Sequence, residues 1–142
     1  MINHFFFFSY VFMDEILSNE SEIIQIEQDH ILYIINTNEN TSSIVGNNDA
    51  DGDIIIPSSI IYELKEYKII SISKDAFKQS YIKSMQFSPD SELQIIDEHA
   101  FDSSFIENFT IPPHLTKIGS YAFHDCKYFK IISFTRFGAS SN

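Results

Sequence analysis

An Ala-Phe pair recurs at a regular interval in the second half of the chain. The pairs occupy residues 76–77, 100–101 and 122–123, and an isoleucine precedes each alanine by four residues. Spacings of 24 and 22 residues are typical of a solenoid, in which each coil buries the face that its neighbour exposes. We therefore predict that successive coils of the chain stack along one axis.

The residues around each pair have distinct expected roles in such a coil. A small alanine allows the backbone to turn a corner close to the next coil, and the phenylalanine fills the interior. An aromatic platform for a ligand is disfavoured, because recurrence at the repeat period is what a packed core requires. The predicted core positions are Ile72, Ala76, Phe77, Ile96, Ala100, Phe101, Ile118, Ala122 and Phe123.

Apolar residues follow each pair in the pattern apolar-x-x-apolar-x-apolar. They are Ile82, Met85 and Phe87, then Ile106, Phe109 and Ile111, then Phe129, Ile132 and Phe134. Alternation of this kind indicates a strand with one buried face. The chain also has 25 Ile and 14 Phe but only 5 Leu, and Ile and Phe are enriched in strands. The predicted fold class is a mainly β repeat solenoid.

The rest of the chain divides by composition. We expect residues 1–20 to be an irregular leader or the remnant of a signal. Within residues 21–53, we expect residues 21–36 to form a β hairpin that turns near 27–30, and residues 37–53 to form a polar connection rich in turn-forming residues. Residues 54–134 are assigned to repeats, and residues 135–142 to a tail that frays.

An apolar run at residues 5–13 is the feature that bears on export. It is too short to span a bilayer, so no membrane insertion is expected. As a secretory signal it lacks a preceding Lys or Arg and a following small-x-small site. The alternative is that Met13 is the true start, which would leave no export signal. Both alternatives stay open on the sequence alone.

Charge and cysteine content exclude several classes of partner and cofactor. The net charge of −11 argues against binding nucleic acid or an anionic membrane surface. The single cysteine, Cys126, allows no intramolecular disulfide and no cysteine zinc cluster. A nucleophilic Cys126 beside His124 is conceivable, but a cysteine inside a structural repeat is more often packed and inert. No cofactor is predicted.

Taken together, these motifs resemble the BspA-type leucine-rich repeat. The segment "FTIPPHLTKIGSYAFHDCKYFKIISF" is similar to the family pattern throughout, and residues 52–77 resemble a first repeat with an extra hairpin. The resemblance covers roughly residues 31–134. It implies a short, right-handed leucine-rich-repeat coil with a parallel sheet on the concave side. It also implies a non-enzymatic protein-binding module of the microbial surface adhesin and surface antigen type, at the cell surface or secreted.

The concave sheet of such a coil would present the residues that lie between the buried ones. These candidate binding residues form two columns, Asp53, Ser84, Asn108 and Ile131 in one, and Ile55, Gln86, Thr110 and Ser133 in the other. Neighbouring strands lie about 4.8 Å apart, so each column should form a ladder. General acid–base catalysis needs positioned titratable groups, and these columns offer almost none.

A calcium-dependent module is a further alternative. Residues 47–54 match early positions of a calcium loop, but Ser58 stands where the bidentate glutamate is needed. We therefore predict no metal site. The sequons at Asn19, Asn40 and Asn108 are glycosylation candidates only if the chain is exported.

The leading hypothesis is a protein–protein binding module, and the partner is not identified by the sequence. An intracellular scaffold or a truncated family member without its own activity is the alternative, and localisation would then be cytoplasmic. No polar cap follows Phe134. We therefore expect either that the chain is a truncated family member or that it self-associates through the C-terminal rung.

Overall fold

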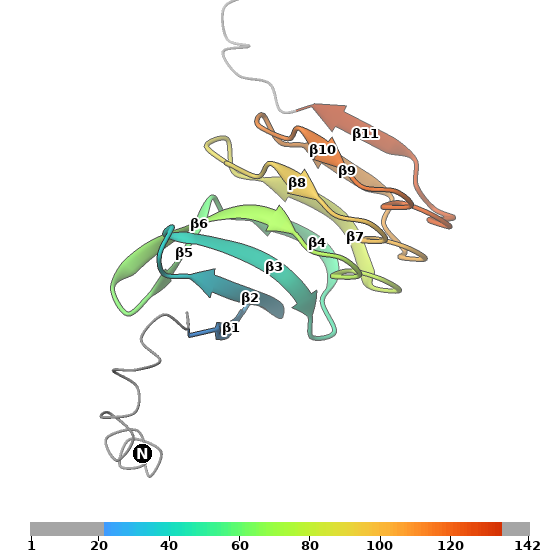
Figure 1. Cartoon of the computed structure of the whole chain (residues 1–142). Helices are drawn as coiled ribbons and strands as arrows, with labels where there is room; N and C mark the ends of the chain where they lie inside the picture. The colour runs from blue at the N-terminus through green and yellow to red at the C-terminus, as the bar shows by residue number, and fades with distance from the viewer. Residues whose placement is uncertain (1–21, 135–142) are drawn as a thin grey trace, which may run out of the picture.

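The computed structural model describes residues 22–134 of the chain. In this range the chain forms β strands and no helix, and it winds into a β solenoid of about three turns (Figure 1). The strands are β1 (Ile24–Gln28), β2 (Ile31–Asn36), β3 (Thr41–Asn47), β4 (Asp51–Ile56), β5 (Ser59–Tyr62), β6 (Lys65–Ile72), β7 (Tyr81–Phe87), β8 (Ile95–Ile96), β9 (Asn108–Ile111), β10 (Lys117–Ile118) and β11 (Ile131–Phe134). The predicted fold class, a β-repeat solenoid with an N-terminal hairpin, is confirmed.

Two sheets enclose the core. The four-stranded sheet has the order β11-β9-β7-β4 and is parallel throughout. The seven-stranded sheet has the order β1-β2-β3-β6-β8-β10, with β5 paired to β6, and its rungs from β3 to β10 are parallel. Each repeat contributes one strand to each sheet, so its apolar residues meet between the two.

The Ala-Phe pairs lie at the corners that join the two sheets. The backbone amide of Phe77 donates to the carbonyl of Ala100 over 2.7 Å, and that of Phe101 donates to Ala122 over 2.7 Å. Backbones this close leave room only for a small side chain at the alanine positions. Each corner also has a residue with positive φ directly before the alanine, namely Asp75, His99 and Tyr121.

The phenylalanines of the corners stack in one column inside the solenoid. The ring centroids of Phe77 and Phe101 are 5.2 Å apart, and those of Phe101 and Phe123 are 4.9 Å apart. Phe77 and Phe101 are fully buried, whereas Phe123 in the last rung is half-buried. The column therefore follows the repeat and loses cover only where the described coils end.

One predicted core position differs from expectation. Ile72 and Ile96 are 0% exposed, but Ile118 is 45% exposed. Ile96 lies under the next rung, since β8 pairs with both β6 and β10. Ile118 belongs to β10, the edge of its sheet within residues 22–134, so no described rung covers it. We call residues 113–134 the last rung.

Hairpins form the N-terminal end. β1 and β2 pair antiparallel around a turn at Asp29 and His30, both with positive φ. β5 and β6 pair around a turn at Glu63 and Leu64, again both with positive φ. Two successive residues of this kind define the tight turns that suit twisted strands.

The polar connection expected over 37–53 is wrong in part, because it contains the strand β3. This strand lies inside the seven-stranded sheet between β2 and β6. Ser42 and Ile44 point to the core and are buried, while the hydroxyl of Ser43 accepts from Ser71 over 2.7 Å. Small serine side chains allow a polar stretch to fill a central strand.

The predicted leader or signal remnant (residues 1–20) and the predicted frayed tail (residues 135–142) stay predictions, because residues 1–21 and 135–142 lie outside the described residues. Within 22–134, no helix is long and apolar enough to cross a membrane.

Candidate functional site

The outward side of the four-stranded sheet carries the predicted columns. Asp53 pairs with Ser84, Ser84 with Asn108, and Asn108 with Ile131 in the strand register. Ile55 likewise pairs with Gln86, and Thr110 with Ser133. We call this side of β4, β7, β9 and β11 the ladder face.

Side chains on the ladder face bond from rung to rung. The hydroxyl of Ser84 donates to Oδ1 of Asp53 over 2.7 Å, and the hydroxyls of Thr110 and Ser133 lie 3.2 Å apart. Ser84 is only 7% exposed, so the accessible groups of this region are those of its neighbours. These bonds hold the surface in one arrangement before any ligand arrives.

A hollow of about 520 Å³ opens on the ladder face. The structure brings all but one of the eight predicted face residues to its wall, and Ile131 is placed only by its pairing with Asn108. The lining residues are Asp53, Ile54, Ile55, Ser84, Met85, Gln86, Asn108, Thr110 and Ser133.

Beside the polar ladders runs a column of exposed aromatic rings. Tyr81 and Phe105 are parallel to within 14° with centroids 5.1 Å apart, and Phe105 and Tyr128 follow at 5.5 Å and 15°. The exposed fractions are 67% for Tyr81, 43% for Phe105 and 51% for Tyr128. We call these three residues the aromatic column. Sequence reasoning from the buried positions did not identify it.

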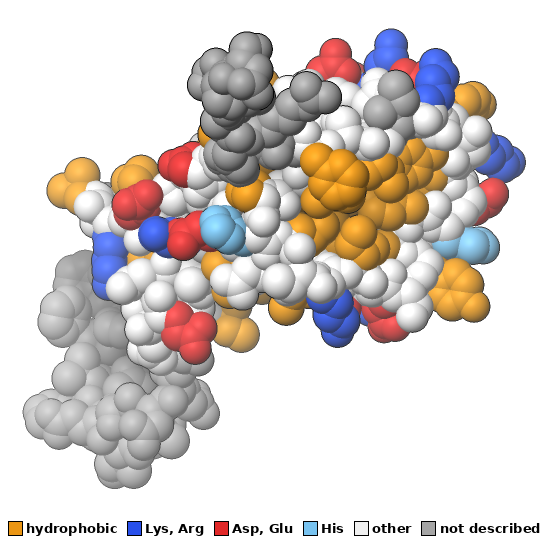
Figure 2. All heavy atoms as spheres, turned by 90° about the horizontal axis from the view of Figure 1, so that it is seen from above, with side chains coloured by type: hydrophobic (Ala, Val, Ile, Leu, Met, Phe, Trp, Pro, Cys, Tyr) orange, Lys and Arg blue, Asp and Glu red, His pale blue; other side chains and the backbone are white. Residues whose placement is uncertain are grey.

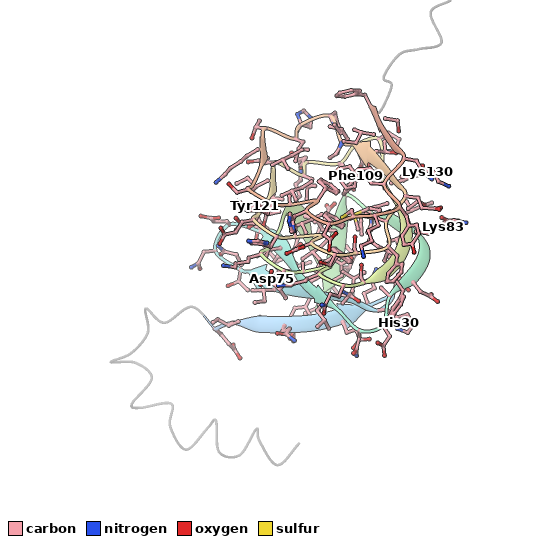
Figure 3. The ribbon with its side chains drawn as sticks, turned by 90° about the vertical axis from the view of Figure 1, so that its right-hand side faces the viewer. His30, Asp75, Lys83, Phe109, Tyr121 and Lys130 are labelled. Carbon is pink, nitrogen blue, oxygen red and sulfur yellow. The ribbon has the colours of Figure 1, made fainter. Side chains whose placement is uncertain are left out.

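A charged column separates the aromatic column from the polar ladders. The Nζ atoms of Lys83 and Lys130 lie 3.8 Å and 3.2 Å from the carboxylate of Glu107. Both lysines extend outward from the same side of the molecule (Figure 3). A second hollow, of about 320 Å³, is lined by Tyr81, Lys83, Phe105, Glu107 and Tyr128.

A repeat signal for both columns is present in the sequence. Tyr81 and Phe105 follow their alanines by five residues, and Lys83 and Glu107 follow by seven. The third unit has one additional residue, so Tyr128 and Lys130 are displaced by one position. Aligning the exposed positions with this insertion would have found the columns.

The corners of the last two rungs share a carboxylate. Nδ1 of His99 lies 2.9 Å from Oδ2 of Asp102, and Nδ1 of His124 lies 3.1 Å from Oδ1. Hydrogen bonds from His124, then from His99 and Ser103, lower the pKa of Asp102 to about 2. The arrangement joins adjacent rungs.

Cys126 is held by carbonyl groups rather than by a base. Its thiol donates to the carbonyl of Phe101 over 3.0 Å, while the imidazole of His124 is directed to Asp102. Burial raises the pKa of Cys126, which opposes thiolate formation. The geometry does not activate the cysteine as a nucleophile.

The calcium-like segment is used in the fold. The side-chain amide of Asn47 donates to the carbonyl of Ala76 over 2.9 Å, and its oxygen accepts from the amide of Ala50 over 3.2 Å. Within residues 22–134 no three His, Cys, Asp or Glu side chains are grouped to hold a metal ion.

Two of the three sequons lie in the described part. Asn40 is exposed in the turn between β2 and β3, with a φ of 56°. Asn108 is exposed on the ladder face. Asn19 lies outside the described residues.

Parallel sheets, stacked corners and a polar outer face define the class of leucine-rich-repeat solenoids. The model of the BspA type leucine rich repeat region matches residues 54–140, in six copies. This match covers more than half of the chain, and the chain belongs to that family. Family and fold are typical of non-enzymatic binding modules.

Solved structures support the fold. The pneumococcal vaccine antigen PcpA is 22% identical with a TM-score of 0.57, over 81% of this chain and 38% of that chain. A leucine-rich repeat protein from Bacteroides capillosus ATCC 29799 is 17% identical with a TM-score of 0.51, over 82% of this chain and 100% of that one. The chain thus spans well under half the length of the antigen. No curated protein matches the chain significantly.

Proposed function

We propose that the protein is a non-enzymatic module that binds a protein partner through the ladder face. The observation that carries this proposal is the aromatic column beside the polar ladders. Tyrosine is among the residues that dominate binding energy at protein interfaces. Here two tyrosines and a phenylalanine are exposed beside a hydrogen-bonded sheet, Tyr81 in β7 and the other two just before β9 and β11.

The face offers several kinds of contact to a partner. The ring edges supply apolar area, Lys83 and Lys130 supply charge, and the hollow over Gln86 and Thr110 supplies donors and acceptors. Because the ladders are held by a parallel sheet and by bonds between side chains, little ordering is needed on binding. The pairing of Glu107 with two lysines leaves it no evident role as an acid or base.

For location, we propose the cell surface or secretion, as the family membership suggests. The adhesin-type role is part of this proposal. An intracellular scaffold is the competing proposal. Protease treatment of intact cells, with an antibody to residues 54–134 as the readout, separates the two. Loss of the signal supports a surface location, and protection until lysis supports an intracellular one.

Binding is tested with three baits. The face variant combines Gln86→Arg and Thr110→Arg, which place bulk at an exposed and a partly exposed position that line the hollow, outside the core. The control variant is Glu66→Arg on β6, away from the four-stranded sheet. We expect a partner to bind the natural chain and the control but not the face variant. Equal binding to all three baits would contradict the proposed face.

We also propose that copies of the chain associate through the last rung. Its apolar side chains are exposed where those of earlier rungs are covered, as Ile118 and Ile96 illustrate. This proposal concerns the end of the solenoid and not the ladder face, and the two surfaces share only Tyr128, the last ring of the aromatic column.

A further inference from the structure

The end of the solenoid at β10 and β11 presents a broad apolar surface. Figure 2, which views the molecule from above Figure 1 and so faces this end, shows hydrophobic side chains gathered there. Phe134 is 72% exposed and Ile132 49%. We call this surface the end face, and its most exposed members are Ile118, Tyr121, Tyr128, Ile132 and Phe134.

Aromatic stacks that run along the solenoid stop at the end face. The interior column ends at Phe123 and the aromatic column ends at Tyr128. A third stack, His99 with Tyr121, has its centroids 5.3 Å apart and also ends in the last rung. Among the described residues no further ring continues these stacks in parallel, and the rings next to Phe123 and Tyr121, those of Phe129 and His124, meet them at an angle. Another apolar end could cover these rings.

The charge of the chain is distributed unevenly along its axis. Residues 22–64 contain eight Asp and Glu and no Lys or Arg. The last rung contains Lys117, Lys127 and Lys130 against Asp125 alone, a net charge of 3 − 1 = +2. The end face is thus the least acidic end of a strongly acidic protein.

The acidity of the N-terminal segments and the apolar character of the end face together favour one arrangement of two copies, against the weaker repulsion of two end faces that each carry +2. If the end faces meet, the two acidic N-terminal segments lie at opposite outer ends, where their repulsion is smallest. A head-to-tail contact would instead place the apolar end face against the acidic end of the next copy. In that contact the exposed rings would face the carboxylates of the next copy, and removing water from these carboxylates costs free energy.

We propose that the chain forms a symmetric, end-to-end dimer in which the two end faces pack on each other. This inference rests on the proposed self-association and adds its symmetry. An interface of this kind closes after two copies, because the same surface is used on both. β11 of one copy then lies beside β11 of the other.

The size of the end face predicts the strength of the dimer. Three of the five exposed side chains are aromatic, and a fully exposed aromatic side chain offers about 150–250 Å². With 51–72% of these three and about half of the two isoleucines exposed, the end face offers on the order of 500 Å² per copy. A pair would bury about 1,000 Å², the lower end for a specific interface. We therefore expect weak, concentration-dependent association.

Sedimentation over a wide range of concentration tests the stoichiometry. The expected result is a mass that rises and saturates at two copies. Ile132→Asp places a charge in the end face and should weaken association by at least about tenfold. Ile61→Asp, the same change at an exposed isoleucine of β5, is the matched control and should leave association unchanged. Thermal unfolding verifies that both variants are folded.

Mixing experiments test the symmetry. In an end-to-end dimer the Ile132→Asp variant cannot pair with the natural chain, because both copies need an intact end face. In a head-to-tail chain the variant would still cap one natural copy. Added salt should strengthen the symmetric dimer by screening like charges, whereas it would weaken a contact between oppositely charged ends.

The outcomes separate the proposals. Species larger than two copies, or pairing of the variant with the natural chain, would overturn the symmetry but not self-association. A monomer at every concentration would overturn both. If a chain ending at Phe134 associates and the full chain does not, the proposed dimer is overturned for the full chain. Residues 135–142 would then be assigned as the segment that covers the end face. These results are read without a partner present, and the variants at Ile132 and Ile61 leave Tyr128, which the end face shares with the aromatic column, unchanged.

Discussion

The rings of Phe101 and Phe123 are parallel to within 2°, with their centroids 4.9 Å apart. Phe101 also stacks on Phe77, so it has a parallel phenylalanine on each side, while Phe123 has a parallel ring on one side and the tilted ring of Phe129 at 5.0 Å. The same residue type at the same repeat position therefore has two environments. This difference gives a direct test of how the solenoid is stabilised.

Phe101→Ala should lower the free energy of unfolding by about 3–5 kcal/mol, as a fully buried phenylalanine replaced by alanine does. Phe123→Ala should cost clearly less, because Phe123 is already half-buried. Urea denaturation followed by circular dichroism measures both. Equal losses would mean that the last rung is covered in solution.

Gly119 is expected to tolerate no larger residue. An added Cβ would lie 2.5 Å from the backbone nitrogen of Glu98 and 2.7 Å from the carbonyl carbon of Asp97, atoms of the preceding rung. Gly119→Ala should therefore cost about 1–3 kcal/mol of stability. Gly46→Ala is the control, because its nearest neighbour would be the flexible end of Leu32 at 3.3 Å. A smaller loss at Gly119 than at Gly46 would contradict the packing of these rungs.

The Asp102 cluster should make stability depend on acid pH. Hydrogen bonds from His124 and His99 lower the pKa of Asp102 from 3.8 to about 2 in the folded chain. A lowered pKa contributes stability that is fully present above about pH 4 and is lost as the pH falls toward 2. Asp102→Asn should remove this part of the acid sensitivity. The comparison is made by thermal unfolding between pH 5 and pH 2, and identical slopes for the two proteins would contradict it.

Replacing either of two buried serines by alanine should have different effects on the free energy of unfolding. The hydroxyl of Ser80 is buried without a hydrogen-bond partner among residues 22–134, whereas that of Ser84 donates to Asp53. Ser80→Ala should be neutral or stabilising, because it removes an unpaired buried polar group. Ser84→Ala should cost about 0.5–1.5 kcal/mol. A larger loss for Ser80→Ala, measured by urea denaturation, would show that its hydroxyl is bonded in solution.

Most of the fold could be predicted from the period of the Ala-Phe pairs, because in stacked repeats each repeat buries the equivalent apolar positions of the repeat beside it. The exposure of Ile118 could not, since it depends on what lies beyond the last rung and not on the residues around it. β3 was missed because Ser42 is small enough to face the core, and hydrophobicity does not reveal such a residue. The aromatic column was not predicted, because the repeat is defined by its buried positions and the additional residue of the third unit shifts the exposed ones out of alignment.

The polar ladders alone would bind a partner weakly. Ser84 and Asp53 bond to each other, so much of their polarity is used within the chain. The aromatic and charged columns supply the accessible groups that the ladders lack. The distance between neighbouring residues of each column is set by the distance between rungs, so a partner would contact three successive repeats at the same time.

The most direct test of the account is lysine labelling of the chain with and without its bound protein partner. Lys83 and Lys130 lie beside the ladder face and pair with Glu107, while Lys74 pairs with Glu98 at a corner and serves as the internal control. We predict that the partner protects Lys83 and Lys130 from an amine-reactive reagent and leaves the reaction of Lys74 unchanged. Protection of Lys74 with free reaction of Lys83 and Lys130 would place the partner elsewhere and contradict the central claim.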